Sequence, residues 1–344
     1  MKVLKIAFCL SLAVLMNYTA LAQVRDLSEP LTPQTKREIV ASLVELLKQK
    51  YIFPDIASKL GAALRANLKD GKYQKVKDHG AFANALTADL RALAHDKHLG
   101  VKHRLGREPR RERLPPRPVI EGDKNKNPPN AEMLPPVRRP PWEIPPTVKT
   151  LDDNIGYLKL NGFGDGDEFQ KAIDKAFDEM AKTDALIIDL RENGGGSPRG
   201  SQYLASYFFD ESVQLSSIIR RNGNDFPEEK FSTLANIKGK KYLKKPVYIL
   251  VSGQTFSAGE NFAYDLQALK RAVITGEITG GGANPGEEFP LVKGMFAFIP
   301  TGRSYNYITK SNWEGKGVQP DIPTNEALEK AVAEIKKNRR SSTK

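Results

Sequence analysis

Apolar residues in the first third of the chain recur every three or four positions, the spacing of amphipathic helices. Thr32 with Pro33, the turn at Pro54 and Asp78 mark three helix starts. The apolar positions behind them are Ile39, Leu43, Leu46 and Leu47, then Ile56, Leu60 and Leu64, then Phe82, Leu86, Leu90 and Leu93. The pattern predicts a helical N-terminal domain over residues 23–103.

The period changes beyond Asn154. IGYLKLNGF alternates like a strand, an amphipathic helix through Phe169 and Phe177 follows, and ALIIDL is the unbroken apolar run of a strand covered on both faces. The same order returns in PVYILV, SAGENFAYDLQAL and AVITGE, then MFAFIP and SYNYIT, before a last helix at about 325–337. Residues 151–344 are therefore expected to form an α/β core with a parallel sheet.

The first 22 residues have the composition of a secretory signal peptide. Lys2 and Lys5 precede a short apolar run, and small residues stand at Ala20 and Ala22. The run is too short to cross about 30 Å of hydrocarbon as an anchor. Residues 1–22 are thus expected to be removed and the mature chain exported, to the periplasm or the medium.

Residues 104–150 are expected to be a basic, proline-rich connector. Between Val101 and Thr150 lie 12 of the 23 prolines and 12 Lys or Arg residues against 6 acidic ones, which is half of the net charge of +12. Such runs, of which REPRRERLPPRP is one, supply neither helix hydrogen bonds nor a core. No aromatic residues alternate with the basic ones in a nucleic-acid-binding pattern, so nucleic acid is not an expected partner. The favoured interpretation is a solvated linker whose charge allows it to lie on the surface of the protein or to associate loosely with an anionic cell envelope.

Cysteine and histidine usage limits metal and redox chemistry. The single cysteine, Cys9, lies inside the predicted signal peptide, so the mature chain forms no disulfide, and a lipid on Cys9 would leave an unusually short apolar segment before it. His95 and His98 are three residues apart, but His103 lies in an extended segment and the three do not make a known zinc spacing. The expectation is no metal and no cofactor.

The stretch PVYILVSGQTFSAGENFAYDL contains the most informative serine. A buried strand passes through a short polar turn straight into a helix that begins near Ser257. A serine at a helix N-terminus lies among unpaired N–H groups that can stabilise a developing oxyanion. From this segment alone, a plain helix cap is an equally good explanation for Ser257.

Glycine-rich loops follow the buried strands. In DLRENGGGSPRG, Gly194 to Gly196 permit close backbone approach, and no Gly-Lys-Ser or Gly-Lys-Thr follows, so a phosphate-binding loop is not indicated. The other use of such a loop is a backbone donor for a substrate carbonyl. Ser197 in this loop is a weaker nucleophile candidate than Ser257.

In order and spacing, KYIFPDIA, HDKHLGV, DLRENGGG, TFSAGE, GEITGGGANPG and WEGKGVQPDI together resemble the carboxyl-terminal processing, or tail-specific, serine peptidase family. The resemblance is to the branch that contains the tricorn-like members and the modules of interphotoreceptor retinoid-binding protein. It implies a ClpP/crotonase-like α/β fold and cleavage of a peptide or protein substrate. The connector occupies the place of the PDZ domain that many members carry.

The resemblance also implies roles for individual residues. Ser257 would be the nucleophile, with backbone N–H groups of Ala258 and Gly195 as the oxyanion hole. The classical lysine base is missing, because GEITGGGANPG has Gly282 at its position. The tricorn-like alternative would make His98 the base and Glu314 the carboxylate that orients it.

Two other classes of function compete with the peptidase. A catalytically degenerate member would bind a hydrophobic ligand or a peptide, as the retinoid-binding branch does, and would have no reason to keep the serine, histidine and glutamate together. An envelope scaffold would act through its connector. The sequence predicts neither the substrate nor the oligomeric state.

Overall fold

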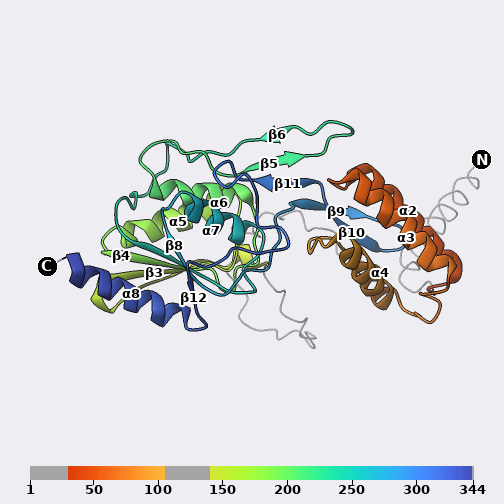
Figure 1. Ribbon diagram of the computed structural model, residues 1–344, viewed down its shortest axis with the longest axis horizontal. Coiled ribbons are helices and arrows are strands. Elements are labelled where there is room, and N and C mark those ends of the chain that lie inside the picture. The colour runs from red at the N-terminus through yellow and green to blue at the C-terminus, as the bar shows by residue number, and fades with distance from the viewer. Residues whose placement is uncertain (1–29, 105–139, 343–344) are drawn as a thin grey trace, which may run out of the picture.

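The structure, a computed structural model, describes residues 30–104 and 140–342. They form two lobes that lie side by side along the long axis of the molecule (Figure 1). One lobe is mainly helical and the other is a parallel sheet covered by helices, so the expected α/β core with an N-terminal helical domain is confirmed.

The helical lobe contains three helices and one three-stranded antiparallel sheet. The helices are α2 (Pro33–Lys50), α3 (Pro54–Lys69) and α4 (His79–Ala94). Thr32 and Asp78 cap α2 and α4 by accepting bonds from Thr35 N and Ala81 N, as their positions predicted. The strands are β1 (Gly100–His103), β9 (Gly286–Pro290) and β10 (Met295–Pro300), in the order β1-β10-β9.

The hairpin of β9 and β10 comes from the C-terminal half of the chain, yet it completes the helical lobe. Leu291, Met295, Ala297 and Ile299 are buried in one apolar cluster with the α2, α3 and α4 side chains. Figure 1 shows these blue strands against the orange helices. The sequence pattern had assigned MFAFIP to the α/β core; the observed pairing of Val101 with Ala297 moves it to the other lobe.

A six-stranded sheet organises the second lobe. Its strands are β2 (Thr147–Leu151), β3 (Ile155–Lys159), β4 (Ala185–Asp189), β7 (Val247–Val251), β8 (Val273–Gly276) and β12 (Ile322–Pro323). Their order is β12-β8-β7-β4-β3-β2, and every neighbouring pair is parallel except β2 with β3. Parallel strands need crossover connections, so their carboxyl ends open on one edge of the sheet.

Helices cover both faces of this sheet. The helices are α5 (Asp167–Met180), α6 (Pro198–Ala205), α7 (Ala258–Ala268) and α8 (Ala327–Ser342). The first three share one core with alternate strand residues such as Ile188 and Ile249, while α8 packs its Ala331 and Ile335 on Ile187 and Leu250. The unbroken apolar runs of β4 and β7 follow from this burial on two sides.

A third, small antiparallel sheet joins β11 (Gly302–Tyr305), β5 (Ser217–Arg220) and β6 (Glu228–Glu229). The predicted signal peptide, residues 1–22, and most of the predicted connector lie outside the described residues. The connector ends earlier than expected, because Thr147–Leu151 is strand β2, which pairs with β3. None of the described helices combines the length and apolar character that crossing a membrane requires.

Candidate active site

Ser257 lies at the carboxyl edge of the sheet, in the turn that joins β7 to α7. It is the N-cap of α7 and has a φ of 53°, which places a non-glycine residue in a left-handed conformation. Such backbone conformations cost free energy and occur where the surrounding structure holds them. Its N–H donates a 2.9 Å bond to Glu260 Oε2, which fixes the turn.

Glu260 ties this turn to the glycine-rich loop after β8. The carboxylate is fully buried and also accepts hydrogen bonds from Thr279 Oγ1, Gly281 N and Gly282 N, at 2.5, 2.6 and 2.9 Å. Burial raises its pKa, and the four donors partly oppose the rise. The sequence reasoning did not single out Glu260, although it lies in the TFSAGE motif.

Gly195 lies directly beside Ser257. A Cβ on Gly195 would fall 2.8 Å from Ser257 Cβ and 3.2 Å from Ala258 N, and its φ is 103°. The space that glycine leaves free is therefore the space in front of the first amide of α7. Because Ala258 begins the helix, its N–H has no carbonyl of a preceding turn to bond.

The N–H of Gly195, the expected second oxyanion donor, already has a partner in this structure. The Gly195 N–H donates a 2.9 Å bond to Asn193 Oδ1, and Asn193 is itself fully buried. Gly195 thus contributes room beside Ser257 and not a free donor. Ser197, the weaker nucleophile candidate, caps α6, and its Oγ accepts the Arg199 N–H at 3.1 Å.

His98 lies between the lobes, in the loop between α4 and β1. Its ring packs on Phe256, with ring centroids 4.5 Å apart, and stacks more loosely on Phe298 at 6.0 Å. Both ring nitrogens are shielded from solvent and have no hydrogen-bond partner. Burial, assisted by Arg91, lowers the pKa of His98 to about 4, so the imidazole is neutral at physiological pH.

Two carboxylates accompany this imidazole. Asp96, His98 and Glu314 each place one ligand atom within 4.8 Å of those of the other two. Glu314 accepts the Ala283 N–H through Oε2, while its Oε1 is buried without a partner. Burial and the nearby Asp96 raise the pKa of Glu314 to about 8.

The structure thus brings His98 and Glu314 together and puts Ser257 one residue from Phe256, the aromatic ring on which His98 packs. Neither nitrogen of His98 is hydrogen-bonded to Ser257. Asp96 is a neighbour that the sequence reasoning missed; it accepts bonds from Tyr51 Oη, His98 N and Asn284 Nδ2 at 3.1, 3.0 and 3.0 Å. The one sequence signal for Asp96 was its place in the HDKHLGV motif, two residues before His98.

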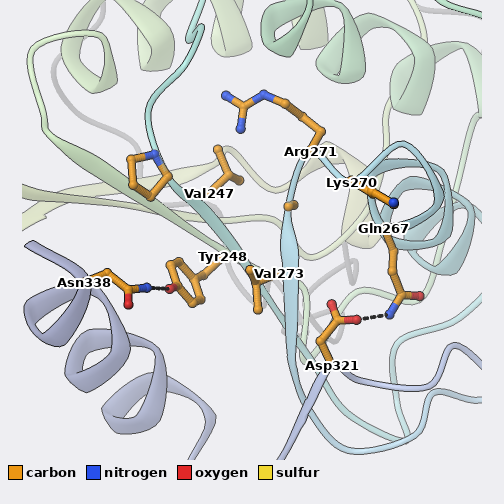
Figure 2. A pocket seen from close by; sticks show the side chains of 10 residues that line it. Val247, Tyr248, Gln267, Lys270, Arg271, Val273, Asp321 and Asn338 are labelled. Carbon is orange, nitrogen blue, oxygen red and sulfur yellow. Dashed lines mark hydrogen bonds between the residues drawn. The ribbon is translucent and has the colours of Figure 1, made fainter. Parts of the chain in front are cut away.

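A pocket of about 420 Å³ lies at the opposite edge of the main sheet (Figure 2). Val247 and Val273, which begin β7 and β8, line it, together with Arg271. Arg271 is already bonded to the carbonyls of Phe208 and Tyr242. Since Ser257 follows the other end of β7, this pocket is separate from the candidate site.

Two family models match the chain. Residues 154–324 match peptidase family S41, and residues 20–136 match the N-terminal domain of peptidase S41 in eukaryotic IRBP. The first match includes Ser257 and Glu314, and the second includes His98.

Curated relatives agree with these matches. Carboxyl-terminal-processing peptidase 2, chloroplastic, of Arabidopsis thaliana is 29% identical over 172 residues, covering 49% of this chain and 32% of that protein. Carboxy-terminal processing protease CtpB of Bacillus subtilis (strain 168) is 25% identical over 178 residues, covering 51% and 35%. The chain therefore spans about a third of the length of the curated relatives it matches.

Solved structures resemble the fold over most of its length. A protein from Parabacteroides merdae ATCC 43184 aligns with a TM-score of 0.59 at 18% identity, over 87% of this chain and 96% of that one. A lipoprotein from Streptococcus agalactiae aligns with a TM-score of 0.54 at 16% identity, over 88% and 96%. At these identities the likeness concerns the fold alone.

Proposed function

Since the chain belongs to peptidase family S41, we propose that it is a serine endopeptidase that acts on peptide or protein substrates. Ser257 attacks the scissile carbonyl carbon, and His98 accepts the hydroxyl proton. The leaving amine takes that proton, and water activated by His98 then hydrolyses the acyl-enzyme. Glu314 holds the imidazole, and the Ala258 N–H donates to the oxyanion.

One observation carries this proposal: a neutral imidazole lies beside the carboxyl group of Glu314 and packs on the residue that precedes a serine at a helix N-terminus. A neutral ring with both nitrogens unpartnered is able to accept a proton. Ser257 and His98 are not hydrogen-bonded, so substrate binding would have to bring them together. Catalytic hydrogen bonds are often long in substrate-free enzymes and shorten when substrate binds.

The glycine at position 282 supports histidine over lysine as the base. A Cβ there would fall 2.3 Å from Phe256 Cζ and 2.7 Å from His98 Cε1. A lysine side chain at this position and the His98 ring would therefore compete for the same space. Lys97, which also contacts this loop, is exposed and donates its Nζ to the Gly280 carbonyl.

A serine-reactive phosphonate carrying a fluorophore tests the nucleophile. We expect it to label Ser257, located by mass spectrometry, and Ser257→Ala to abolish both the label and hydrolysis of a denatured protein substrate. His98→Ala should lower the rate by several orders of magnitude and should not add to Ser257→Ala, because the members of one catalytic unit fail together.

Two variants serve as controls for this experiment. Ser197→Ala removes the other loop serine and should keep both label and activity. Lys97→Ala should also stay active, because its ammonium group is not the proposed base. Labelling of Ser197, or loss of activity in Lys97→Ala with His98→Ala still active, would contradict the assigned roles.

The binding-protein alternative is not favoured. Its site would be an apolar cleft, whereas two carboxylates and a histidine lie together here. If the protein binds a peptide but is not labelled by the phosphonate, the binding-protein alternative would be favoured instead.

We further propose that the protein is exported after removal of residues 1–22. The support is the sequence of this segment alone, with its lysines, apolar run and small residues at Ala20 and Ala22. Intact-mass measurement on the cell-envelope and medium fractions should give a chain that begins at Gln23. A mass that includes Met1 would contradict export by this route.

A further inference from the structure

The cluster of Asp96, His98 and Glu314 contains buried polar atoms that lack hydrogen-bond partners. Both His98 nitrogens and Glu314 Oε1 are buried and have no hydrogen-bond partner. Asp96 is 2% exposed, and its partners Tyr51, Asn284 and the His98 amide are all neutral. The shell supplies donors for Asp96 but none for the imidazole.

Among the described residues Arg91 is the cation that acts on His98, and no ion pair among them involves the carboxyl group of Asp96 or of Glu314. The charged side chains that act most strongly on Glu314 are Asp96 and Glu260, both acidic. Glu260 is itself buried, with its donors coming from Thr279 and the backbone. Burial of like charges is unfavourable; at neutral pH a proton on Glu314, whose pKa is raised to about 8, relieves it, and a bound cation that displaces this proton would do the same.

We propose that Asp96, His98 and Glu314 form a binding site for a divalent transition metal ion, Zn²⁺ in particular, and that the ion competes with catalysis. One imidazole nitrogen and two carboxylate oxygens are a ligand set that zinc accepts, with a fourth position left open for water. The ligand atoms are now up to 4.8 Å apart. Zinc bonds of about 2.0–2.2 Å bring such atoms to roughly 3.3 Å, so the side chains have to close by more than 1 Å.

Glu314 is the side chain free to make that movement, because its Oε1 has no partner, whereas Asp96 is held by several donors. The ring of His98 is held between Phe256 and Phe298, so its nitrogens can bind the ion without a movement of the loop between α4 and β1. An imidazole ligand also favours zinc over Mg²⁺ or Ca²⁺, which prefer oxygen in larger numbers. These ligands differ from the set of His95, His98 and His103, whose spacing in the sequence does not match a known zinc site. His103 stacks on His79 and is not part of the cluster.

The effect on activity rests on the proposed function; the binding does not. A zinc ion on His98 takes the lone pair that would accept the Ser257 proton. The zinc-saturated enzyme should then be as slow as His98→Ala. Removal of zinc by a chelator should restore the full rate, because no covalent bond of the protein changes.

Binding is tested on Ser257→Ala, which is inactive under the proposed function and keeps all three ligands. We expect isothermal titration with Zn²⁺ to give one site, at least tenfold weaker in His98→Ala and in Glu314→Gln. His103→Ala is the matched control, because it removes an imidazole from the His79–His103 pair and should leave the affinity unchanged. Co²⁺ should give visible absorption bands of a low-coordinate site in the same protein, a readout that does not depend on any ligand variant folding.

The outcomes separate the two proposals. Absence of a one-to-one zinc site, or a site lost in His103→Ala and kept in His98→Ala, overturns the metal site and leaves the peptidase untouched. Zinc binding by a wild-type chain that hydrolyses nothing overturns the peptidase and leaves the metal site. Zinc that binds at His98 without slowing an active enzyme overturns the competition.

Discussion

Gly195 shows how much depends on one missing side chain. Gly195→Ala would put a methyl group 2.8 Å from Ser257 Cβ and in front of the Ala258 amide, at a φ of 103°. We expect the rate to fall on the order of 10²-fold, as when an oxyanion site is blocked. The strained backbone should lower the free energy of unfolding by about 1–3 kcal/mol. Steady-state kinetics and urea unfolding measure the two effects; an alanine variant with the wild-type rate would contradict the proposed position of the oxyanion.

Gly282 makes room for the imidazole in the same way. Gly282→Ala should push the Phe256 and His98 rings and reduce kcat more than it raises KM, at an overpacking cost of about 1–3 kcal/mol. Gly282→Lys should be inactive too, because the lysine side chain displaces His98 and nothing in the loop directs its ammonium group to Ser257. Gly280→Ala in the same loop is a weaker control, because its Cβ would meet Phe256 at 2.7 Å and the Thr255 carbonyl oxygen at 3.2 Å, whereas His98 is not among its nearest neighbours. A Gly282→Lys variant with full activity would favour lysine as the base.

At the scale of elements, α7 is anchored by a buried carboxyl group. Asp265 accepts bonds from Ser216 N and Oγ, Asn306 Nδ2 and Asn261 Nδ2. Burial raises its pKa to about 6, above the ordinary value of 3.8. The folded state therefore holds this proton more tightly than the unfolded state. The stabilisation is full below about pH 3.8 and is lost as the pH rises through 6.

Between pH 5 and 7 this group should remove about 1.4 kcal/mol from the free energy of unfolding. Urea unfolding of wild type and Asp265→Asn at both pH values isolates the effect. We expect the wild type to lose stability relative to the variant by that amount as the pH rises, since asparagine does not titrate. A constant difference between the two proteins would show that Asp265 titrates alike in both states.

The elements were largely predictable, because apolar spacing is a local property. The caps at Thr32 and Asp78, the buried run of β7 and the helix start at Ser257 all follow from neighbouring residues. The site was less predictable, because its partners come from distant positions. Asp96 bonds Asn284, 188 positions away, and no spacing rule predicts that contact; the bond from the Gly195 amide to Asn193, by contrast, is a local turn contact between residues two apart.

At the scale of the molecule, the helical lobe depends on a hairpin from far along the chain. The buried side chains of Met295, Ala297 and Ile299 belong to its apolar core. Residues 30–104 alone should therefore fail to unfold cooperatively, whereas the same segment joined by a flexible linker to residues 286–300 should do so. Thermal melts followed by circular dichroism compare them, with Met295→Asp in the fused chain as the control. A cooperative melt of residues 30–104 by themselves would contradict this dependence.

Pairing of β1 with β10 also sets the order of events while the chain is being made. Val101 pairs with Ala297, so nearly two hundred further residues must be synthesised before the sheet of the lobe that contains His98 can form. Until then its apolar surface is open to chaperones. The proposed base reaches its position only after almost the whole chain exists, so a nascent or truncated chain carries the serine without a working partner. Under the proposed function, unfinished copies would have no base in position and would not cleave the proteins around them.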